Sequence, residues 1–326
     1  MTDRPDASSN PLMRPLLFSI ALAALALTGC EAPTETRPPE STSKSEEAPM
    51  SLMTWKDLLT RERPSTAHHI RTGPGTSNVI DLWLPDGKGP FPVVIMVHGG
   101  CWQKSIADRT LMNFAAEDLR QRGLAVWNIE YRGVDEDGGG YPGTFEDVAR
   151  ATDLLRDYAD EYNLKLDRIA AMGHSAGGHL ALWLAARPKL PRSSPLWSET
   201  PLHLDLVVNS GGLADLEASA PVTQEGCLAS IMDVLTGAPS GQRPDVFSDT
   251  SPAAMLPFAA RQVSVNGEQD RIAPPILGKH YTKKAKAAGS AASFIQVPDT
   301  GHVELIAPGS EAFEMEAALL TEELKR

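Results

Sequence analysis

Residues 168–186 have the sequence RIAAMGHSAGGHLALWLAA, and this stretch decides the fold. Its first part, 168–172, is a short apolar run that predicts a buried strand, and 176–186 predicts a helix directly after it. Between them lies Gly-His-Ser-Ala-Gly, a G-x-S-x-G pattern centred on Ser175. The pattern alone is weak, because a glycine-rich turn with an ordinary serine gives the same letters. The strand before it and the helix after it favour a nucleophile elbow, the sharp turn that exposes a reactive serine.

Apolar runs and amphipathic stretches alternate along most of the chain. Strands are expected at 78–84, 92–97, 125–131, 204–209, 262–265 and 293–297, and helices at 111–122, 144–162, 275–288 and 310–325. This alternation predicts an α/β fold with a mostly parallel, doubly wound sheet and helices on both faces. The stretch 211–257 interrupts the alternation, and we interpret it as a small cap insertion with a helix at 228–235.

Composition and charge narrow the class of protein. The chain has 326 residues, of which 42% are hydrophobic and 22% charged, an ordinary globular mixture. A net charge of -12 argues against a nucleic-acid partner, because phosphate binding requires clustered Lys and Arg. Three cysteines are too few for a disulfide-built scaffold, and their spacing fits no zinc site. We therefore expect one domain over 51–326, with no metal and no cofactor.

The N-terminus has the features of a targeting segment. An apolar run over 16–27 is too short to span a bilayer and leads into Leu-Thr-Gly-Cys, which resembles the lipobox of bacterial lipoproteins. The resemblance implies that 1–30 is a lipoprotein signal peptide and that Cys30 is acylated. The alternative is a chance cysteine beside a plain signal peptide. Residues 31–50, rich in Glu, Pro, Ser and Thr, are expected to be a disordered tether.

A lipid on Cys30 would place the protein in the bacterial cell envelope. Lipoproteins retained at the inner membrane usually carry an aspartate after the acylated cysteine, and this chain has Glu31 there. We therefore expect a lipid-anchored protein that faces the periplasm or lies on the outer membrane. Its contact with the membrane would be through the N-terminal anchor only.

Residues 98–102, with the sequence HGGCW, follow the strand expected at 92–97 and resemble the HGG oxyanion loop of α/β-hydrolase esterases. The resemblance implies that the backbone N–H groups of Gly100 or Cys101, together with that of Ala176, bind the acyl oxygen. Each such donor is worth roughly 3 kcal/mol in the transition state.

The remaining residues of the two motifs are expected to support the chemistry rather than to react. His98 is expected to brace the loop, and the glycines, Gly99 among them, to let it fold so that its backbone N–H groups point at the acyl oxygen. Trp102 is expected to pack in the core, with pocket lining as the alternative. Gly173 and Gly177 carry no side chain and so allow the backbone to close around the serine.

Two loops that follow later strands carry the residues that would activate Ser175. Asp270 follows the strand expected at 262–265, and His302 lies in the last loop before the final helix. The order Ser, Asp, His is that of α/β-hydrolases, in which the histidine is the base and the acid orients it. Glu268 is the alternative acid, although it lies close to the end of its strand.

From residue 78 to the C-terminus, the chain resembles the α/β-hydrolase superfamily. HGGCW, EYR, GHSAGGHLALW and GHVELI together resemble the branch that holds kynurenine formamidases and bacterial acetyl- or feruloyl-type esterases. Cys101 departs from that pattern and leaves the substrate open. The resemblance implies a serine carboxylic ester hydrolase that acts on small molecules through an acyl-enzyme. One alternative is an arylformamidase or amidase acting on N-acyl aromatic amines, and another is a non-catalytic envelope binding protein of the same fold.

Two further expectations concern the mouth of the site. Only 187–202 and 211–257 are expected to build the pocket wall, and neither resembles a long apolar lid. The substrate is therefore expected to carry a short acyl group, acetyl to butyryl.

With Cys30 acylated, Cys101 and Cys227 remain as an even pair outside the cytosol, where disulfides persist. A disulfide between them would require Cα atoms within roughly 7 Å. The alternative is two unrelated small side chains in the core.

Overall fold

The computed structural model describes residues 51–223 and 227–326 of the chain. The predicted signal peptide with Cys30 and the predicted tether at 31–50 lie outside the described residues. Among those described, none of the helices is both long and apolar enough to cross a bilayer.

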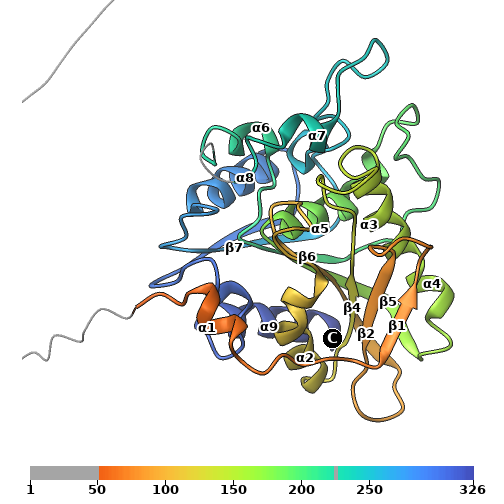
Figure 1. The fold of residues 1–326 in the computed structure, drawn as a ribbon, viewed down its shortest axis with the longest axis vertical. Helices are drawn as coiled ribbons and strands as arrows, with labels where there is room; N and C mark the ends of the chain where they lie inside the picture. The colour runs from red at the N-terminus through yellow and green to blue at the C-terminus, as the bar shows by residue number, and fades with distance from the viewer. Residues whose placement is uncertain (1–50, 224–226) are drawn as a thin grey trace, which may run out of the picture. The chain divides into compact units, whose positions relative to one another are not determined.

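Eight strands form one sheet in the order β1-β2-β4-β3-β5-β6-β7-β8 (Figure 1). Six neighbouring strands, β4-β3-β5-β6-β7-β8, pair in parallel. The other two, β1 and β2, add an antiparallel edge. This confirms the predicted mostly parallel sheet; β1 was not predicted. The strand bounds are β1 His68–Arg71, β2 Val79–Trp83, β3 Phe91–Val97, β4 Ala125–Ile129, β5 Leu164–His174, β6 Leu206–Ser210, β7 Arg261–Gly267 and β8 Ala292–Val297.

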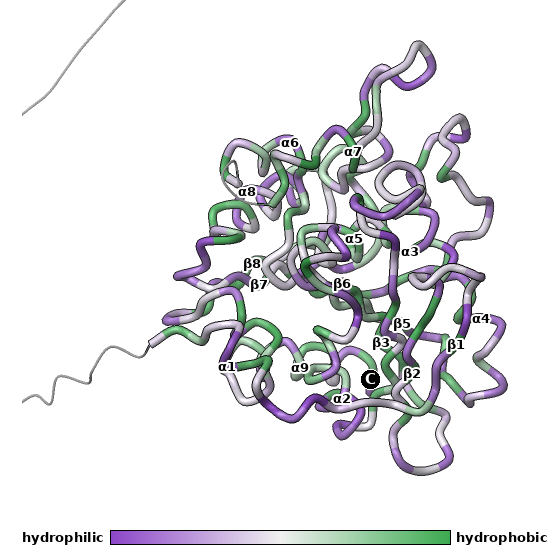
Figure 2. Tube along the Cα trace, in the orientation of Figure 1, coloured by the Kyte–Doolittle hydropathy of each residue, from purple (hydrophilic) through white to green (hydrophobic). Residues whose placement is uncertain are grey.

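Helices cover both faces of the sheet, as predicted. Side chains alternate along a strand, so β3 contributes to a hydrophobic cluster on each face of the sheet. Val93, Ile95 and Val97 belong to the cluster shared with helices α3 and α5. Val94 and Met96 belong to the cluster shared with helices α2 and α9. Figure 2 shows hydrophobic residues along the central strands. The helix bounds are α1 Trp55–Leu59, α2 Asn113–Gln121, α3 Gly143–Asp153, α4 Leu155–Tyr158, α5 Ala176–Ala186, α6 Leu216–Ser219, α7 Met232–Thr236, α8 Pro275–Ala287 and α9 Glu311–Leu324.

Several helices differ from the sequence prediction. The helix expected over 144–162 is two shorter helices, α3 and α4. The helix expected at 228–235 is the shorter α7, within the stretch that separates β6 from β7. The helix α1 was not predicted, and it proves to belong to the pocket described below.

Parallel pairing brings four sequence motifs to one edge of the sheet. The carboxyl ends of β3, β5, β7 and β8 lead into the segments that carry HGGCW, Ser175, Asp270 and His302, respectively. Since loops that follow parallel strands meet at the same edge, this topology gathers residues that are far apart in the chain.

Candidate active site

Ser175 lies on the sharp turn between β5 and α5. Its backbone has φ 55° and ψ -121°, a strained conformation for a residue with a side chain. The glycines on either side are required by close contacts: a Cβ on Gly173 would lie 2.0 Å from the carbonyl oxygen of Gly177, and a Cβ on Gly177 would lie 2.1 Å from that of Val97. The local geometry is therefore that of a nucleophile elbow.

His302 and Asp270 form a buried hydrogen-bonded pair. Nδ1 of His302 donates to Oδ2 of Asp270 over 2.6 Å, and the two residues are only 6% and 3% exposed. The other carboxylate oxygen, Oδ1, accepts the backbone N–H groups of Ile272 at 2.8 Å and Ala273 at 2.9 Å. Asp270 is thus held on both sides, and it leaves Nε2 of His302 as the nitrogen available to Ser175.

The alternative acid, Glu268, lies outside this arrangement. Its side chain is exposed, and its carboxylate accepts a long hydrogen bond of 3.4 Å from Gln296. The structure therefore brings Asp270, rather than Glu268, to His302.

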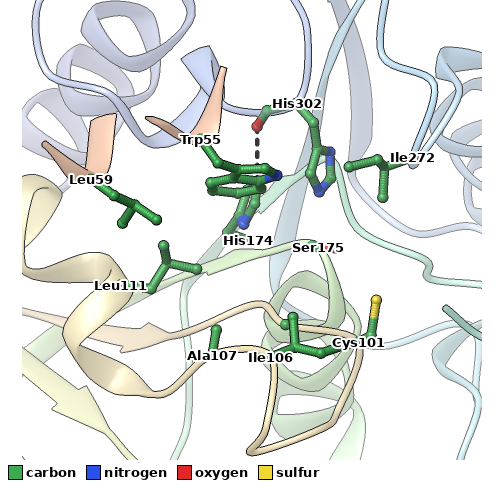
Figure 3. Close-up of a pocket in the computed structure, with 11 residues that line it drawn as sticks. Trp55, Leu59, Cys101, Ile106, Ala107, Leu111, His174, Ser175, Ile272 and His302 are labelled. Atoms are coloured by element: carbon green, nitrogen blue, oxygen red, sulfur yellow. Dashed lines mark hydrogen bonds between the residues drawn. The ribbon is translucent and has the colours of Figure 1, made fainter. Parts of the chain in front are cut away.

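Sequence reasoning assigned no role to His174, which borders the same pocket. Its Nε2 donates to the carbonyl oxygen of His302 over 3.1 Å (Figure 3). The centroids of the two imidazole rings lie 4.4 Å apart. Burial, together with the nearby His302, lowers the pKa of His174 well below its usual range, so its ring is neutral. His174 therefore supports the backbone of the base without adding a competing charge.

The loop after β3 lies beside Ser175. Gly100 has φ 105°, a conformation that favours glycine, and a Cβ there would lie 2.7 Å from the Cβ of Ala107. Gly100 and Cys101 both line the pocket that contains Ser175. Across 51–223 and 227–326, no hydrogen bond uses the N–H of Gly100, Cys101 or Ala176. Three backbone donors are thus free at the place where the resemblance predicts an oxyanion hole.

His98 contacts both its neighbour in this loop and a buried carboxylate. Its Nδ1 contacts the carbonyl oxygen of Gly99 at 2.7 Å, and its Nε2 contacts the buried carboxylate of Glu130 at 2.7 Å. Burial alone would raise the pKa of Glu130, but His98 and Lys104 lower it to about 2. The carboxylate of Glu130 therefore stays charged and holds the loop through its contact with His98. Gly99 approaches the site closely, since a Cβ on it would lie 2.8 Å from Nδ1 of His174.

Trp102 packs in the core rather than lining the pocket. It is fully buried, and its indole N–H donates to His179 over 3.2 Å. Burial lowers the pKa of His179 to about 4, so this partner is an uncharged acceptor.

A disulfide joins Cys101 of this loop to Cys227, with the Cα atoms 5.1 Å apart. The geometric requirement stated for the pair is therefore met. The bond connects the loop beside Ser175 to the stretch between β6 and β7.

The pocket has a volume of about 210 Å³ and a largely apolar lining (Figure 3). Trp55 and Leu59 of α1 line it together with Ile106, Leu111 and Ile272. The wall predicted from 187–202 and 211–257 was wrong: among the described residues of those two stretches, none lines the pocket.

The source of the error is visible in both structure and sequence. Trp55 of the helix α1 lines the pocket next to His174 and His302. The pattern Thr54-Trp-Lys-Asp57 is a capping box, a signal for the start of a helix that could have identified α1.

Comparison with known proteins relates the chain to esterases. Residues 80–284 match the model of the family described as BD-FAE. Esterase LipC of Mycobacterium tuberculosis is 25% identical over 238 residues, which cover 71% of this chain and 58% of LipC. Kynurenine formamidase of Drosophila melanogaster is 26% identical over 145 residues, or 43% of this chain and 46% of that protein. The chain spans about half the length of the curated relatives it matches.

Solved structures agree with the fold. Esterase B from Lactobacillus rhamnosis, inhibited by a C4-C4 SN3 tributyrin phosphonate, has a TM-score of 0.67 at 19% identity, covering 82% of this chain and 90% of that chain. A truncated carbohydrate esterase from gut microbiota has a TM-score of 0.65 at 23% identity, covering 79% of this chain and 95% of that chain. The predicted α/β-hydrolase fold is confirmed. Because the family model matches more than half of its residues, the chain belongs to the BD-FAE family.

Proposed function

We propose that the protein is a serine carboxylic ester hydrolase, with Ser175 as nucleophile, His302 as base and Asp270 as the residue that orients the base. The observation that carries the proposal is the buried 2.6 Å contact between Asp270 and Nδ1 of His302, because His302 lines a pocket together with Ser175 on its elbow. Membership of the BD-FAE family and similarity to esterases support the same reaction class.

The reaction follows from which atoms are free. Nε2 of His302 accepts the Ser175 hydroxyl proton as the serine oxygen attacks the ester carbonyl carbon. The N–H groups of Ala176 and of Gly100 or Cys101 stabilise the negative charge on the carbonyl oxygen. Protonated His302 gives its proton to the departing alcohol and leaves an acyl-enzyme. His302 then deprotonates a water that attacks the acyl carbon, and the collapse releases the acid and restores Ser175.

We infer that the preferred acyl groups are short, acetyl to butyryl. A volume of about 210 Å³ is below the roughly 300–1,000 Å³ typical of pockets for drug-sized ligands. The similar esterase B of Lactobacillus rhamnosis is described with a tributyrin phosphonate, which also has short acyl chains.

The test combines a covalent probe with ester turnover. A fluorophosphonate is expected to add its mass to the wild type and to Ser240→Ala, an exposed-loop control, but not to Ser175→Ala. Hydrolysis of p-nitrophenyl butyrate should fall by roughly 10⁴-fold or more in Ser175→Ala. An unlabelled wild type without esterase activity would contradict the proposal and favour a binding protein of the same fold.

A second candidate is an arylformamidase, because a kynurenine formamidase is among the relatives. The same residues would perform that reaction, with an amine in place of the alcohol as leaving group. N-formylkynurenine is therefore assayed beside the p-nitrophenyl esters. A higher kcat/KM for N-formylkynurenine than for every ester would make this the better assignment.

We also propose that the protein is anchored in the bacterial cell envelope by a lipid on Cys30, on the basis of the lipobox-like sequence. Cys30→Ser is expected to lose the mass of the lipid and to move out of the membrane fraction. Unchanged mass and fractionation in this variant would contradict the anchor.

A further inference from the structure

We propose that α1 sets the length of the substrate chain that the site accepts, with Trp55 and Leu59 as its specificity-determining residues. We call these two side chains the α1 wall. The inference rests on the proposed function and adds a substrate-size determinant to it. The wall lies outside residues 80–284, so the family match does not include it.

Trp55 lies directly against the reactive centre. Its ring contacts those of His302 and His174 edge-on, with centroid distances of 6.3 Å and 6.1 Å (Figure 3). A substrate chain that enters the pocket beside Ser175 therefore meets the indole within the pocket that also holds the base.

Leu59 extends the wall toward the mouth. It is 41% exposed, and two other lining residues, Ile106 and Ile272, are 56% and 40% exposed. Half of the exposed large hydrophobic residues in the described part of the chain thus border this one pocket. Such clustering indicates that the mouth contacts an apolar portion of the substrate.

The wall is fixed in place rather than loosely attached. Thr54 and Asp57 form a capping box at the start of α1, and Leu58 is fully buried in a hydrophobic cluster. The carboxylate of Glu304 accepts the N–H of Met53 with one oxygen and the N–H of Gly301, next to His302, with the other. One buried carboxylate therefore holds both the wall and the loop of the base.

A fixed wall around a small pocket has a measurable consequence. A chain longer than the pocket must displace the indole or leave its apolar end in water. Replacing Trp55 with alanine removes the largest lining side chain and creates room for further methylenes, each of which can change discrimination by roughly tenfold or more.

The experiment compares two ester series in the wild type and three variants. One series is p-nitrophenyl esters from acetate to octanoate, and the other is acetate esters of linear alcohols from methyl to octyl. We expect Trp55→Ala to raise the kcat/KM ratio of the longest to the four-carbon substrate about tenfold in at least one series. Leu59→Ala, at an exposed position that should tolerate the change, is expected to raise it several-fold. Lys56→Ala, on the same helix but outside the pocket, should leave the ratio within twofold of the wild type.

Fluorophosphonate labelling of Ser175 in every variant separates the possible failures. Labelled, active variants whose ratios equal the wild-type ratio in both series would overturn the role of the α1 wall and leave the proposed esterase function intact. A wild type that neither reacts with the probe nor hydrolyses any ester would overturn the proposed function, and this inference with it. If Trp55→Ala fails to fold, the Leu59→Ala ratio decides the question.

Discussion

The hydrogen bonds around Asp270 predict what the isosteric change Asp270→Asn would do. Oδ1 accepts two backbone N–H groups, from Ile272 and Ala273. An amide nitrogen cannot accept those bonds, so the amide oxygen of the asparagine must take this position. Its NH₂ group then faces His302 and donates to Nδ1.

This reversal changes the tautomer of the base. When Nδ1 accepts a hydrogen bond, the proton of neutral His302 lies on Nε2, which can no longer accept the proton of Ser175. We expect kcat to fall by about 10⁴-fold, or roughly 5.4 kcal/mol of transition-state stabilisation. KM should change little, because Asp270 lies behind His302.

The assay is steady-state hydrolysis of p-nitrophenyl butyrate at neutral pH, with thermal unfolding to verify the fold. Glu268→Gln is the matched control, since it makes the same chemical change two residues away on an exposed side chain. A folded Asp270→Asn protein that loses less than tenfold in kcat would refute the reasoning. So would a Glu268→Gln variant that is equally impaired.

Three further predictions concern other features. Burial raises the pKa of Glu316, on α9, well above its usual 4.5, so the folded state keeps a proton that the unfolded state releases. In urea unfolding, the wild type should therefore lose stability relative to Glu316→Gln as the pH rises above about 4.5, by up to about 1.4 kcal/mol per pH unit. Cys227→Ser opens a loop closed across 126 residues, and chain entropy predicts a loss of roughly 4 to 5 kcal/mol of unfolding free energy, which a reductant should reproduce in the wild type. Gly100→Ala, whose Cβ would lie 2.7 Å from that of Ala107, should displace the loop and lower kcat on p-nitrophenyl butyrate by about 10²-fold while the protein still folds. An unchanged kcat in Gly100→Ala would count against the N–H groups of Gly100 and Cys101 as part of an oxyanion hole.

Features encoded within one strand and its following loop could be predicted from the sequence. The apolar run before Ser175 and the glycines around it are contiguous, so the elbow is visible in the letters alone. Asp270 and His302 each follow a strand, and parallel pairing brings such residues to the same sheet edge without further information. Local hydrophobic periodicity likewise predicted seven of the eight strands that the structure describes, β1 being the exception, and most of the longer helices.

The pocket wall could not be predicted in this way. Trp55 reaches His302 because the segment before α1 meets the loop after β8, and hydropathy periodicity carries no information about such a distant pairing. The contact of His174 with the carbonyl oxygen of His302 joins residues that are 128 positions apart in the chain, so the supporting role of His174 was also missed.

The hydrogen bond between Met53 and Glu304 also bears on the order in which the molecule is completed. Its partners are 251 residues apart, so a chain synthesised from its N-terminus makes α1 first and the residues that hold α1 nearly last. The sheet centre can assemble while α1 has no place to dock, and the pocket closes only when both ends of the chain are present. In refolding, contacts between such distant segments form slowly, so acquisition of activity should be a late step, later than the gain of secondary structure.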